Sequence, residues 1–225
     1  MQEHFISEIE NLKTNLIKMA SIVDEMVDRT ITALESSNIE LCKGIKAKDL
    51  EVDAYDNLIQ TQCENILALF NPVASDLRFV ISALMINNQL ERCGDIAVNI
   101  SKRIKKTAEY KELIIESQII EMAKRAKEML KKAIDSFILN NSEIAKDVLQ
   151  SDEAVDKLNK QIFKFLVQKM QENKEIIEAC SHLLIMTRHI ERLADHATNV
   201  AENLVFYVEA RVVTHFKKLQ EKSKE

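Results

Sequence analysis

The most constraining feature of this sequence is its shortage of turn residues, because 225 residues include only two glycines and one proline. Average usage would give roughly 16 glycines and 11 prolines in a chain of this length. Sheets, barrels and nucleotide-binding loops need many such residues at their turns, so these architectures are strongly disfavoured. The composition is instead rich in Ala, Leu, Ile, Lys and Glu, which helices favour or tolerate. The sequence therefore predicts an all-α protein.

The charge balance limits the classes of partner. Lys and Arg total 31 and Asp and Glu total 36, which gives a net charge of −5. Nucleic-acid-binding proteins normally carry a basic excess or a basic stripe, so we expect no nucleic-acid partner. The N-terminus does not resemble a signal peptide, and the longest apolar stretch, residues 79–86, is too short to span a membrane. These features predict a soluble, cytoplasmic protein without membrane insertion.

The cysteines indicate a structural role. The chain has four of them and no C-x-x-C pair, and no other pattern in the sequence indicates a disulfide framework or a redox motif. We expect all four to be reduced and packed in the core, namely Cys42, Cys63, Cys93 and Cys180.

Apolar residues recur at spacings of three and four along most of the chain, which is the pattern of helices packed in a bundle. A Ser37–Glu40 capping box, Asn71-Pro72, Asn141-Ser142 and the polar stretch 171–174 interrupt this pattern. Gly44 predicts a kink near the start of the second helix, and residues 217–225 form a charge-rich run typical of a frayed helix end. The breaks delimit six long helices, over about residues 5–36, 37–70, 74–107, 112–139, 143–170 and 175–211.

An internal repeat divides the chain into two similar halves. Residues 81–104 align with residues 181–204 at an offset of 100, and six of the 24 positions are identical. Four of those six are polar, and packing of a helical core does not enforce identity at polar positions. We infer two tandem three-helix bundles, residues 1–109 and 110–225, related by a pseudo-two-fold internal repeat. The identical residues of the first half are Leu84, Glu91, Arg92, Asp95, Ala97 and Asn99.

In the first half, acidic side chains occupy helix positions that are predicted to face the core. Glu91, Asp95 and Asn99 are spaced four apart and therefore line one face of a helix. That face also continues the apolar stripe formed by Leu77, Ile81 and Leu84. In a hairpin that turns at the Asn-Pro break, Asp49 and Asp53 of the preceding helix become neighbours of Glu91 and Asp95. Four carboxylates should then share one partly buried patch.

The second half repeats this arrangement. Asp152 and Asp156 lead the inward stripe of one helix, and a hairpin places them beside Glu191 and Asp195 of the next helix. Asn199 follows Asp195 at the same spacing of four, as Asn99 follows Asp95 in the first half.

Four ionised carboxylates cannot share a partly buried patch without compensating cations. No Lys or Arg stands at the facing positions of the first half, and Arg92 and Arg192 lie about a quarter turn away. Oxygen-only ligands favour Fe, Mn or Mg over Zn or Cu. We therefore predict one metal site in each half, each with room for more than one ion. The predicted ligands are Asp49, Asp53, Glu91, Asp95 and Asn99 in the first half, and Asp152, Asp156, Glu191, Asp195 and Asn199 in the second.

Two simpler interpretations stand beside this prediction. An E-x-x-x-D spacing on a helix is usually a solvated face, and these acids would point at water if the predicted inward stripe were wrong by one position. His182, His189 and His196 lie seven apart and form a stripe that is more typical of a surface or an interface than of ligands.

No nucleophile-and-base arrangement or glycine-rich loop is recognisable, so the sequence does not predict an enzyme.

Two stretches of the chain resemble a known family. The string NPVASDLRFVISALMINNQLERCGDIAVNI resembles the signature of the PhoU family of phosphate-signalling proteins, and FISEIENLKTNLIKMASIVDEMV is similar to the start of that family. The duplicated E-R-x-x-D-x-x-x-N pattern also fits the two-repeat build of the family, and the resemblance covers essentially the whole chain. The second half departs from the pattern, because it lacks the P-x-x-x-D-L-R segment and has Asn159 where the first half has Asp56.

The resemblance implies a fold, a metal motif and a set of partners. The implied fold is a pair of three-helix bundles, and the family's E(D)-x-x-x-D metal motif falls on Glu91 with Asp95 and on Glu191 with Asp195. The implied function is negative regulation of the phosphate-starvation response and of phosphate transport through protein–protein contacts. The implied partners are the ATPase of a phosphate ABC transporter and a phosphate-sensing histidine kinase, which would place the protein in the cytoplasm at the inner face of the membrane, with a homodimer as a further expectation.

Two other functions compete with this one. A carboxylate-bridged di-iron enzyme or iron store is the main alternative, but such four-helix sites usually need Glu-x-x-His on two helices. No E-x-x-H occurs anywhere in this chain. A metal-free helical adaptor is the other alternative, and metal analysis of the purified protein before and after chelation separates it from the metal-binding protein.

Overall fold

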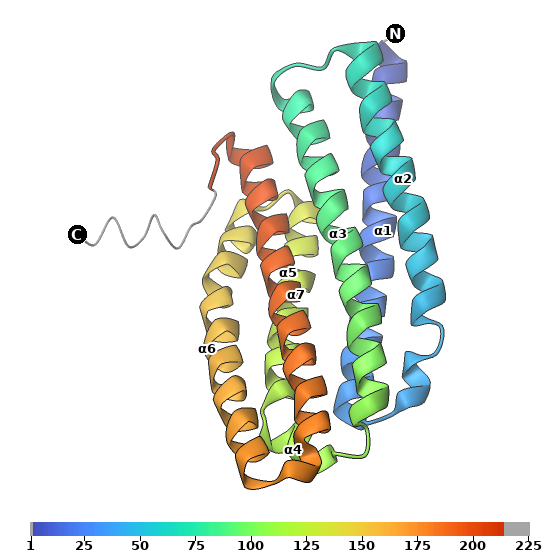
Figure 1. Cartoon of the computed structure of the whole chain (residues 1–225). Helices are drawn as coiled ribbons and strands as arrows, with labels where there is room; N and C mark the ends of the chain where they lie inside the picture. Colours follow the sequence, from blue (N-terminus) through green and yellow to red (C-terminus); the bar gives the residue numbers. More distant parts are fainter. Residues whose placement is uncertain (1, 214–225) are drawn as a thin grey trace, which may run out of the picture.

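The computed structural model of the protein describes residues 2–213 and confirms the all-α prediction (Figure 1). No β-strand occurs in this part of the chain. The six long helices are α1 (Gln2–Ser36), α2 (Ile45–Phe70), α3 (Ala74–Thr107), α5 (Ile119–Leu139), α6 (Ser142–Glu172) and α7 (Ile177–Glu209). A short helix, α4 (Lys111–Glu116), and two single-turn 3₁₀ helices, Ile39–Cys42 and Lys174–Ile176, complete the helical elements of the described residues.

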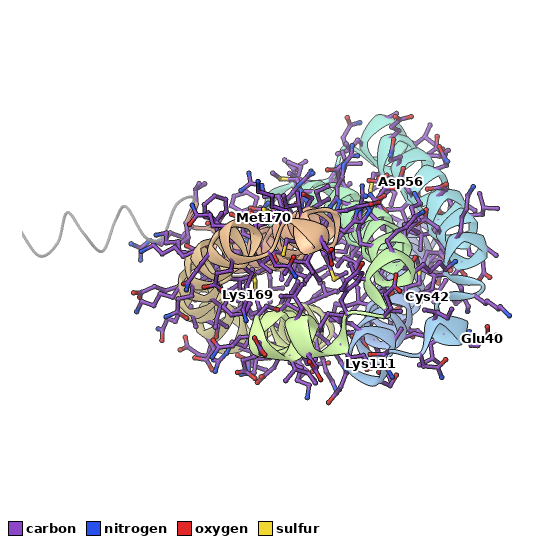
Figure 2. The ribbon with its side chains drawn as sticks, turned by 60° about the horizontal axis from the view of Figure 1, so that its bottom comes forward. Glu40, Cys42, Asp56, Lys111, Lys169 and Met170 are labelled. Atoms are coloured by element: carbon purple, nitrogen blue, oxygen red, sulfur yellow. The ribbon has the colours of Figure 1, made fainter. Side chains whose placement is uncertain are left out.

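The two halves form antiparallel three-helix bundles that lie side by side (Figure 1). In the first bundle α1, α2 and α3 pack against one another, and in the second α5, α6 and α7 do so. The bundles meet mainly through α3 and α7, with α1 and α5 forming a second contact between them. Buried apolar side chains of both bundles belong to one continuous core. Figure 2 brings the end with α4 forward and shows Asp56 on the first bundle and Lys169 and Met170 on the second.

The chain between α1 and α2 differs from the prediction. Ser37 has a left-handed backbone (φ 52°), and the side chain of Asn38 instead accepts a hydrogen bond from the Glu40 amide nitrogen (3.1 Å). The predicted Ser37–Glu40 capping box is therefore wrong, and Asn38 caps a 3₁₀ helix. Gly44 also has a positive φ of 81°, which explains why it ends this turn and precedes α2 rather than kinking the helix.

The second half begins with two helices where the sequence predicted one over residues 112–139. Gln118 adopts a left-handed conformation (φ 62°) and separates α4 from α5. The break at Asn141 is confirmed, because its side chain accepts hydrogen bonds from the backbone amides of Glu143 and Ile144 at the start of α6. Helix α7 ends at Glu209, two residues before the predicted end. The tail at residues 217–225, predicted as a frayed helix end, lies outside the described residues.

The buried faces of α2 and α3 are rotated from the predicted stripe. Ile81 and Leu84, predicted to point inward, are 37% and 38% exposed, so that part of the prediction is wrong. In α2, Val52 is fully buried and is adjacent to Asp53, the residue predicted to face inward. The rotation arises because α3 is covered by α1, α2 and α7 together rather than by a single hairpin partner. Acidic residues therefore lie at the margin of the buried face.

All four cysteines are free and buried, which confirms the structural role expected from the sequence. The pKa of the Cys63 thiol is raised to about 12, mainly by burial and then by the charge of Glu64, so this thiol stays protonated at neutral pH.

Candidate metal centre

Acidic side chains of α2 and α3 approach one another in the first half, as the hairpin predicted. The Cys63 Sγ atom lies 3.8 Å from the Val80 carbonyl oxygen, and the Asn87 side-chain nitrogen donates to Asp56 Oδ1 at 2.6 Å. In these contacts the two helices pair within one helical turn of the alignment that places Asp49 and Asp53 beside Glu91 and Asp95. The sequence therefore predicts the pairing of these helices, although not the phase of their buried faces.

Within this cluster, Asp49 is the residue whose pKa is raised most clearly. The pKa of its carboxyl is raised to about 6, mainly by burial and then by the neighbouring carboxylates of Asp95 and Asp53, while Lys102 acts in the opposite direction. The structure thus brings together three of the predicted ligands, and their mutual repulsion is only partly offset by one lysine.

Glu91 contributes a second perturbed carboxylate from α3. Burial is the main cause that raises its pKa; Arg92 lowers it, and Asp95, Asp56 and Asp53 raise it. Its Oε2 atom is buried and accepts no hydrogen bond of good geometry, although Arg92 Nε lies 3.3 Å away. Arg92 also lies 3.8 Å from Asp95 but is half exposed, so it compensates one edge of the cluster only.

The missing side chain of Gly94 leaves room for the acidic cluster between α2 and α3. A Cβ atom at this position would lie 3.1 Å from Asp49 Oδ1 and 3.5 Å from a methyl group of Val52. The absence of a side chain on α3 therefore lets the Asp49 carboxylate sit against the helix backbone. At the equivalent position of the second repeat the chain has Ala194, so the two halves differ in the shape of their clusters.

The two predicted Asn ligands have polar partners of their own. Asn99 Oδ1 accepts a hydrogen bond from Lys102 Nζ (3.2 Å), which draws Lys102 toward the acidic cluster. Asn199 Nδ2 donates to Gln89 Oε1 across the α3–α7 contact (3.0 Å), so its amide group is directed to the other half of the molecule.

Asp56 was on the predicted acidic stripe of α2 but was not among the predicted ligands. Its Oδ1 accepts from Asn87 and its Oδ2 accepts from Gln60 at 2.7 Å, so both oxygens already have donors. Asp56 therefore acts as a hydrogen-bonded anchor between α2 and α3 next to the cluster. This contact was not predicted from the sequence, and the polar residue Asn87 among the apolar residues of this helix is the signal that could have found it.

The second half presents its acids on α6 and α7, which pack along each other. Asp152 is buried (6% exposed), Asp156 is half-buried and Asp195 is exposed. The side chain of Glu191 is 16% exposed and pairs with Arg188, whose Nη1 lies 3.0 Å from Oε2 and 3.2 Å from Oε1. An arginine therefore already neutralises part of this cluster.

The present positions of the acidic side chains decide whether they can hold a metal ion. Among residues 2–213, no three His, Cys, Asp or Glu side chains converge closely enough to hold an ion as they stand. The donor set of the first half nevertheless suits a hard cation, because it consists of carboxylates, one of them an unsatisfied buried oxygen and another with a raised pKa.

The histidine stripe lies on the contact between the halves rather than in an acidic cluster. His196 Nδ1 lies 2.8 Å from Gln89 Oε1, and His182 Nδ1 lies 3.0 Å from Arg103 Nη1. The pKa of His196 is lowered to about 4, mainly by burial and then by the positive charges of Arg192 and Arg92. The expectation of an interface role agrees with these contacts.

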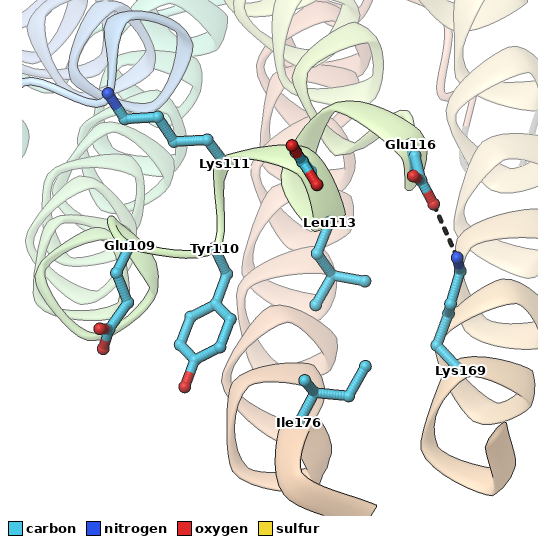
Figure 3. A pocket seen from close by; sticks show the side chains of 8 residues that line it. Glu109, Tyr110, Lys111, Leu113, Glu116, Lys169 and Ile176 are labelled. Carbon is cyan, nitrogen blue, oxygen red and sulfur yellow. Dashed lines mark ion pairs between the residues drawn. The ribbon is translucent and has the colours of Figure 1, made fainter. Parts of the chain in front are cut away.

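A separate hollow of about 430 Å³ lies at the α4 end of the molecule (Figure 3). It is lined by residues of the connection between the halves, by Lys169 near the end of α6 and by Ile176 of the 3₁₀ helix that follows α6. Glu116 and Lys169 form an ion pair of 2.7 Å at its edge. The predicted metal ligands do not line it. Sequence patterns did not indicate this hollow, because it depends on how α4 is set across the bundle end.

Comparison with known proteins identifies the family. A sequence model described as the PhoU domain matches the chain twice, at residues 16–104 and 119–204. The chain belongs to the PhoU family. The two matches fall one in each half, in agreement with the tandem repeat, while the boundary between residues 109 and 110 stays a prediction.

Curated relatives cover nearly the whole chain. A phosphate-specific transport system accessory protein PhoU homolog of Aquifex aeolicus is 36% identical over 208 residues, which cover 92% of this chain and 94% of the relative. The protein of the same description from Clostridium acetobutylicum is 31% identical over 210 residues, 93% of this chain and 96% of the relative.

Solved PhoU structures have the same fold. The crystal structure of PhoU from Pseudomonas aeruginosa is 27% identical, covers 92% of this chain and all of that chain, and has a TM-score of 0.85. The crystal structure of the phosphate transport system regulatory protein PhoU from Streptococcus pneumoniae is 29% identical, covers 93% and 99% of the two chains, and has a TM-score of 0.83. Within residues 2–213 no helix is long and apolar enough to cross a membrane.

Proposed function

We propose that this protein is a metal-binding negative regulator of phosphate-starvation signalling and phosphate transport, and that it acts through protein–protein contacts without catalysing a reaction. The observation that carries the proposal is the double PhoU-domain match, supported by relatives described as accessory proteins of the phosphate-specific transport system. The proposed partners are the ATPase of a phosphate ABC transporter and a phosphate-sensing histidine kinase. Contact with them holds the protein at the inner face of the membrane.

The proposed ligands of an Fe, Mn or Mg ion in the first half are the opposed carboxylates of α2 and α3, namely Asp49, Asp53, Glu91 and Asp95. The unsatisfied Glu91 oxygen and the raised pKa of Asp49 support this assignment, since a cation would relieve both. In the second half the corresponding residues are Asp152, Asp156, Glu191 and Asp195. A bound ion supplies positive charge and open coordination positions to carboxylate or phosphate groups of a partner.

Metal analysis tests the ligands directly. Replacing Asp95 and Asp195 together by Ala should remove the bound Fe, Mn or Mg that elemental analysis detects in the wild-type protein, while circular dichroism shows unchanged helix content. Glu128→Ala on α5 serves as a matched control, because it removes an exposed carboxylate (66% exposed) that pairs with Lys132 and is not among the proposed ligands. Wild-type protein that binds none of the three metals after reconstitution contradicts the metal part of the proposal.

A gene deletion tests the regulatory part. Deleting the gene should leave phosphate-starvation genes expressed in phosphate-rich medium, and the wild-type gene should restore repression. Pull-down of the wild-type protein should recover the transporter ATPase and the kinase. Normal repression in the deletion strain, together with pull-downs that recover neither partner, would contradict this function.

A further inference from the structure

A hollow of about 520 Å³ opens between α6 and α7, which pack side by side in the second bundle (Figure 1). Both helices contribute cations to it, Lys160 and Lys164 from α6 and Arg188 from α7. Its lining is otherwise apolar or neutral, with Phe163 and Leu184 as the apolar side chains, and no Asp or Glu is among the residues that line it. The hollow therefore combines an apolar surface with positive charge from two sides.

The apolar side chains at this hollow are open to solvent. The side chain of Phe163 is 56% exposed, and Ile185 on α7 is 40% exposed. Ile185 lines a second hollow, of about 360 Å³, which shares Leu184 and Arg188 with the first, so the two hollows adjoin along α7. Exposed apolar side chains beside a concave surface are typical of a place where another molecule binds.

The equivalent positions of the first half are neutral and polar. The repeats align α2 with α6 at an offset of 103, as the correspondence of Asp56 with Asn159 shows, and α3 with α7 at an offset of 100. The counterparts of the three cations and the phenylalanine are Asn57, Gln60, Thr61 and Asn88. Both halves have the same helix packing, so the fold does not require a basic and apolar surface here. We infer that this surface serves a contact made by the second half alone.

The hydrogen bonds at this level of the two bundles also differ. In the first half Asp56 accepts hydrogen bonds from Asn87 of α3 (2.6 Å) and from Gln60 of its own helix (2.7 Å). In the second half Phe163 stands in place of Gln60, and the hydroxyl group of Thr187 donates to a carbonyl oxygen of its own helix (2.8 Å). The hollow thus lies where the first half has a polar contact between helices, and it offers room for a side chain from outside.

We propose that this surface docks an amphipathic helix of a partner protein, with an apolar side chain of that helix against Phe163 and Leu184 and its carboxylates beside Lys160, Lys164 and Arg188. A groove between two helices accepts the apolar face of a third helix, and opposite charges at its rim select and orient the partner. The chain has a net charge of −5, so this basic surface is a local feature that attracts an acidic partner to one place.

An anionic membrane is the other binding partner that such cations could attract. Lipid recognition usually takes a cluster of about four to eight Lys or Arg. Here three cations surround a concave hollow in a chain of net negative charge, which favours a protein helix. The proposal rests on the part of the proposed function that assigns protein–protein contacts, but it does not depend on the metal ions, because none of the proposed metal ligands lines the hollow.

Site-specific photo-crosslinking of the full-length protein tests the proposal. Replacing Phe163 by the photoreactive analogue p-benzoylphenylalanine, in cells whose own copy of the gene is deleted, places the probe in the hollow. Irradiation should give one main adduct, and mass spectrometry should show a joined peptide with more Asp and Glu than Lys and Arg and with apolar residues three and four apart. Adding Lys164→Glu should lower the yield of this adduct about tenfold or more, because like charges would then meet.

Two controls come from the same chain. Lys157→Glu reverses an exposed charge (68% exposed) on α6 that does not line the hollow, and it should leave the yield unchanged. The same probe at Leu139, an exposed apolar position (64% exposed) at the end of α5, should not give this adduct. Circular dichroism of each variant checks that the fold is kept.

The proposal is overturned if the probe at position 163 gives no adduct, if the joined peptide is neutral or basic, or if Lys164→Glu and Lys157→Glu give equal yields. Flotation with phosphatidylglycerol vesicles provides the membrane arm, and binding that Lys164→Glu abolishes would assign the surface to lipid and also overturn the proposal. An acidic amphipathic helix from a protein other than the transporter ATPase or the kinase would uphold the docking surface and contradict the proposed partners.

Discussion

Asp49 shows at the scale of one residue how the acidic cluster couples stability to pH. Its carboxyl has a pKa of about 6 in the folded protein, above the ordinary value of 3.8, first because of burial and then because of Asp95 and Asp53. The folded state therefore binds this proton more tightly than the unfolded state does. The resulting stabilisation is complete below pH 3.8 and is lost as the pH rises through about 6.

We predict that the metal-free wild-type protein gains stability relative to an Asp49→Asn variant as the pH falls from 7 to 5. The comparison with a variant is needed because His196 acts in the opposite direction. Its pKa of about 4 lies below the ordinary 6.5, so its contribution is present above pH 6.5 and is lost as the pH falls. Urea unfolding at several pH values measures the difference, and a constant difference over this range would show that Asp49 is not perturbed.

At the scale of an element, Gly94 sets the spacing between α2 and α3. Glycine within a helix costs about 1 kcal/mol relative to alanine, so its place in the middle of α3 needs a reason. The reason is the Asp49 carboxylate, whose oxygen occupies the space that a side chain at position 94 would fill.

We predict that Gly94→Ala keeps or raises the free energy of unfolding, by up to about 1 kcal/mol, but weakens metal binding in the first half. The added methyl group would displace Asp49 from the cluster, while the helix itself becomes more favourable. Denaturant unfolding and metal titration measure the two effects. Ala194→Gly is the control for the second half and should lower stability by about 1 kcal/mol without changing metal binding in the first. Unchanged first-half affinity in Gly94→Ala would exclude Asp49 as a ligand.

At the scale of the whole molecule, the two bundles share one core. Ala97 and Ala197, at equivalent positions of the repeats, are both buried in the central helices. The contact is extended by Phe79 against Tyr207, whose ring centroids are 5.4 Å apart, and by a hydrogen bond from Arg78 Nε to the Tyr207 carbonyl oxygen (3.4 Å).

We therefore predict that the two halves unfold together. Scanning calorimetry should show one transition whose calorimetric and van't Hoff enthalpies agree, because separating α3 from α7 exposes apolar core surface of both bundles. The same experiment on the Ala97→Asp variant should show a lower transition temperature that is still a single transition. Two resolved transitions in the wild type would mean that each half is stable alone.

The sequence by itself determined the helices, the repeat and the pairing of acidic residues. Helix ends follow from local chemistry, so the Asn71-Pro72 and Asn141-Ser142 breaks were predicted where the structure has them. The break at Gln118 was missed because it depends on a left-handed backbone at a residue type that does not favour it. The proximity of Asp49 to Asp95 followed from the hairpin alone, since two helices joined by a short turn must run back along each other.

Only the tertiary structure decided which helix faces are buried. Ile81 and Leu84 fit the apolar period as well as the buried residues do, yet they are exposed, because α3 has neighbours on three sides and its buried arc is set by all of them. The periodicity of one helix carries no information about how many partners will cover it. For the same reason the sequence could not place the histidine stripe against α3. The contact between Gln89 and His196 arises only where the two repeats meet.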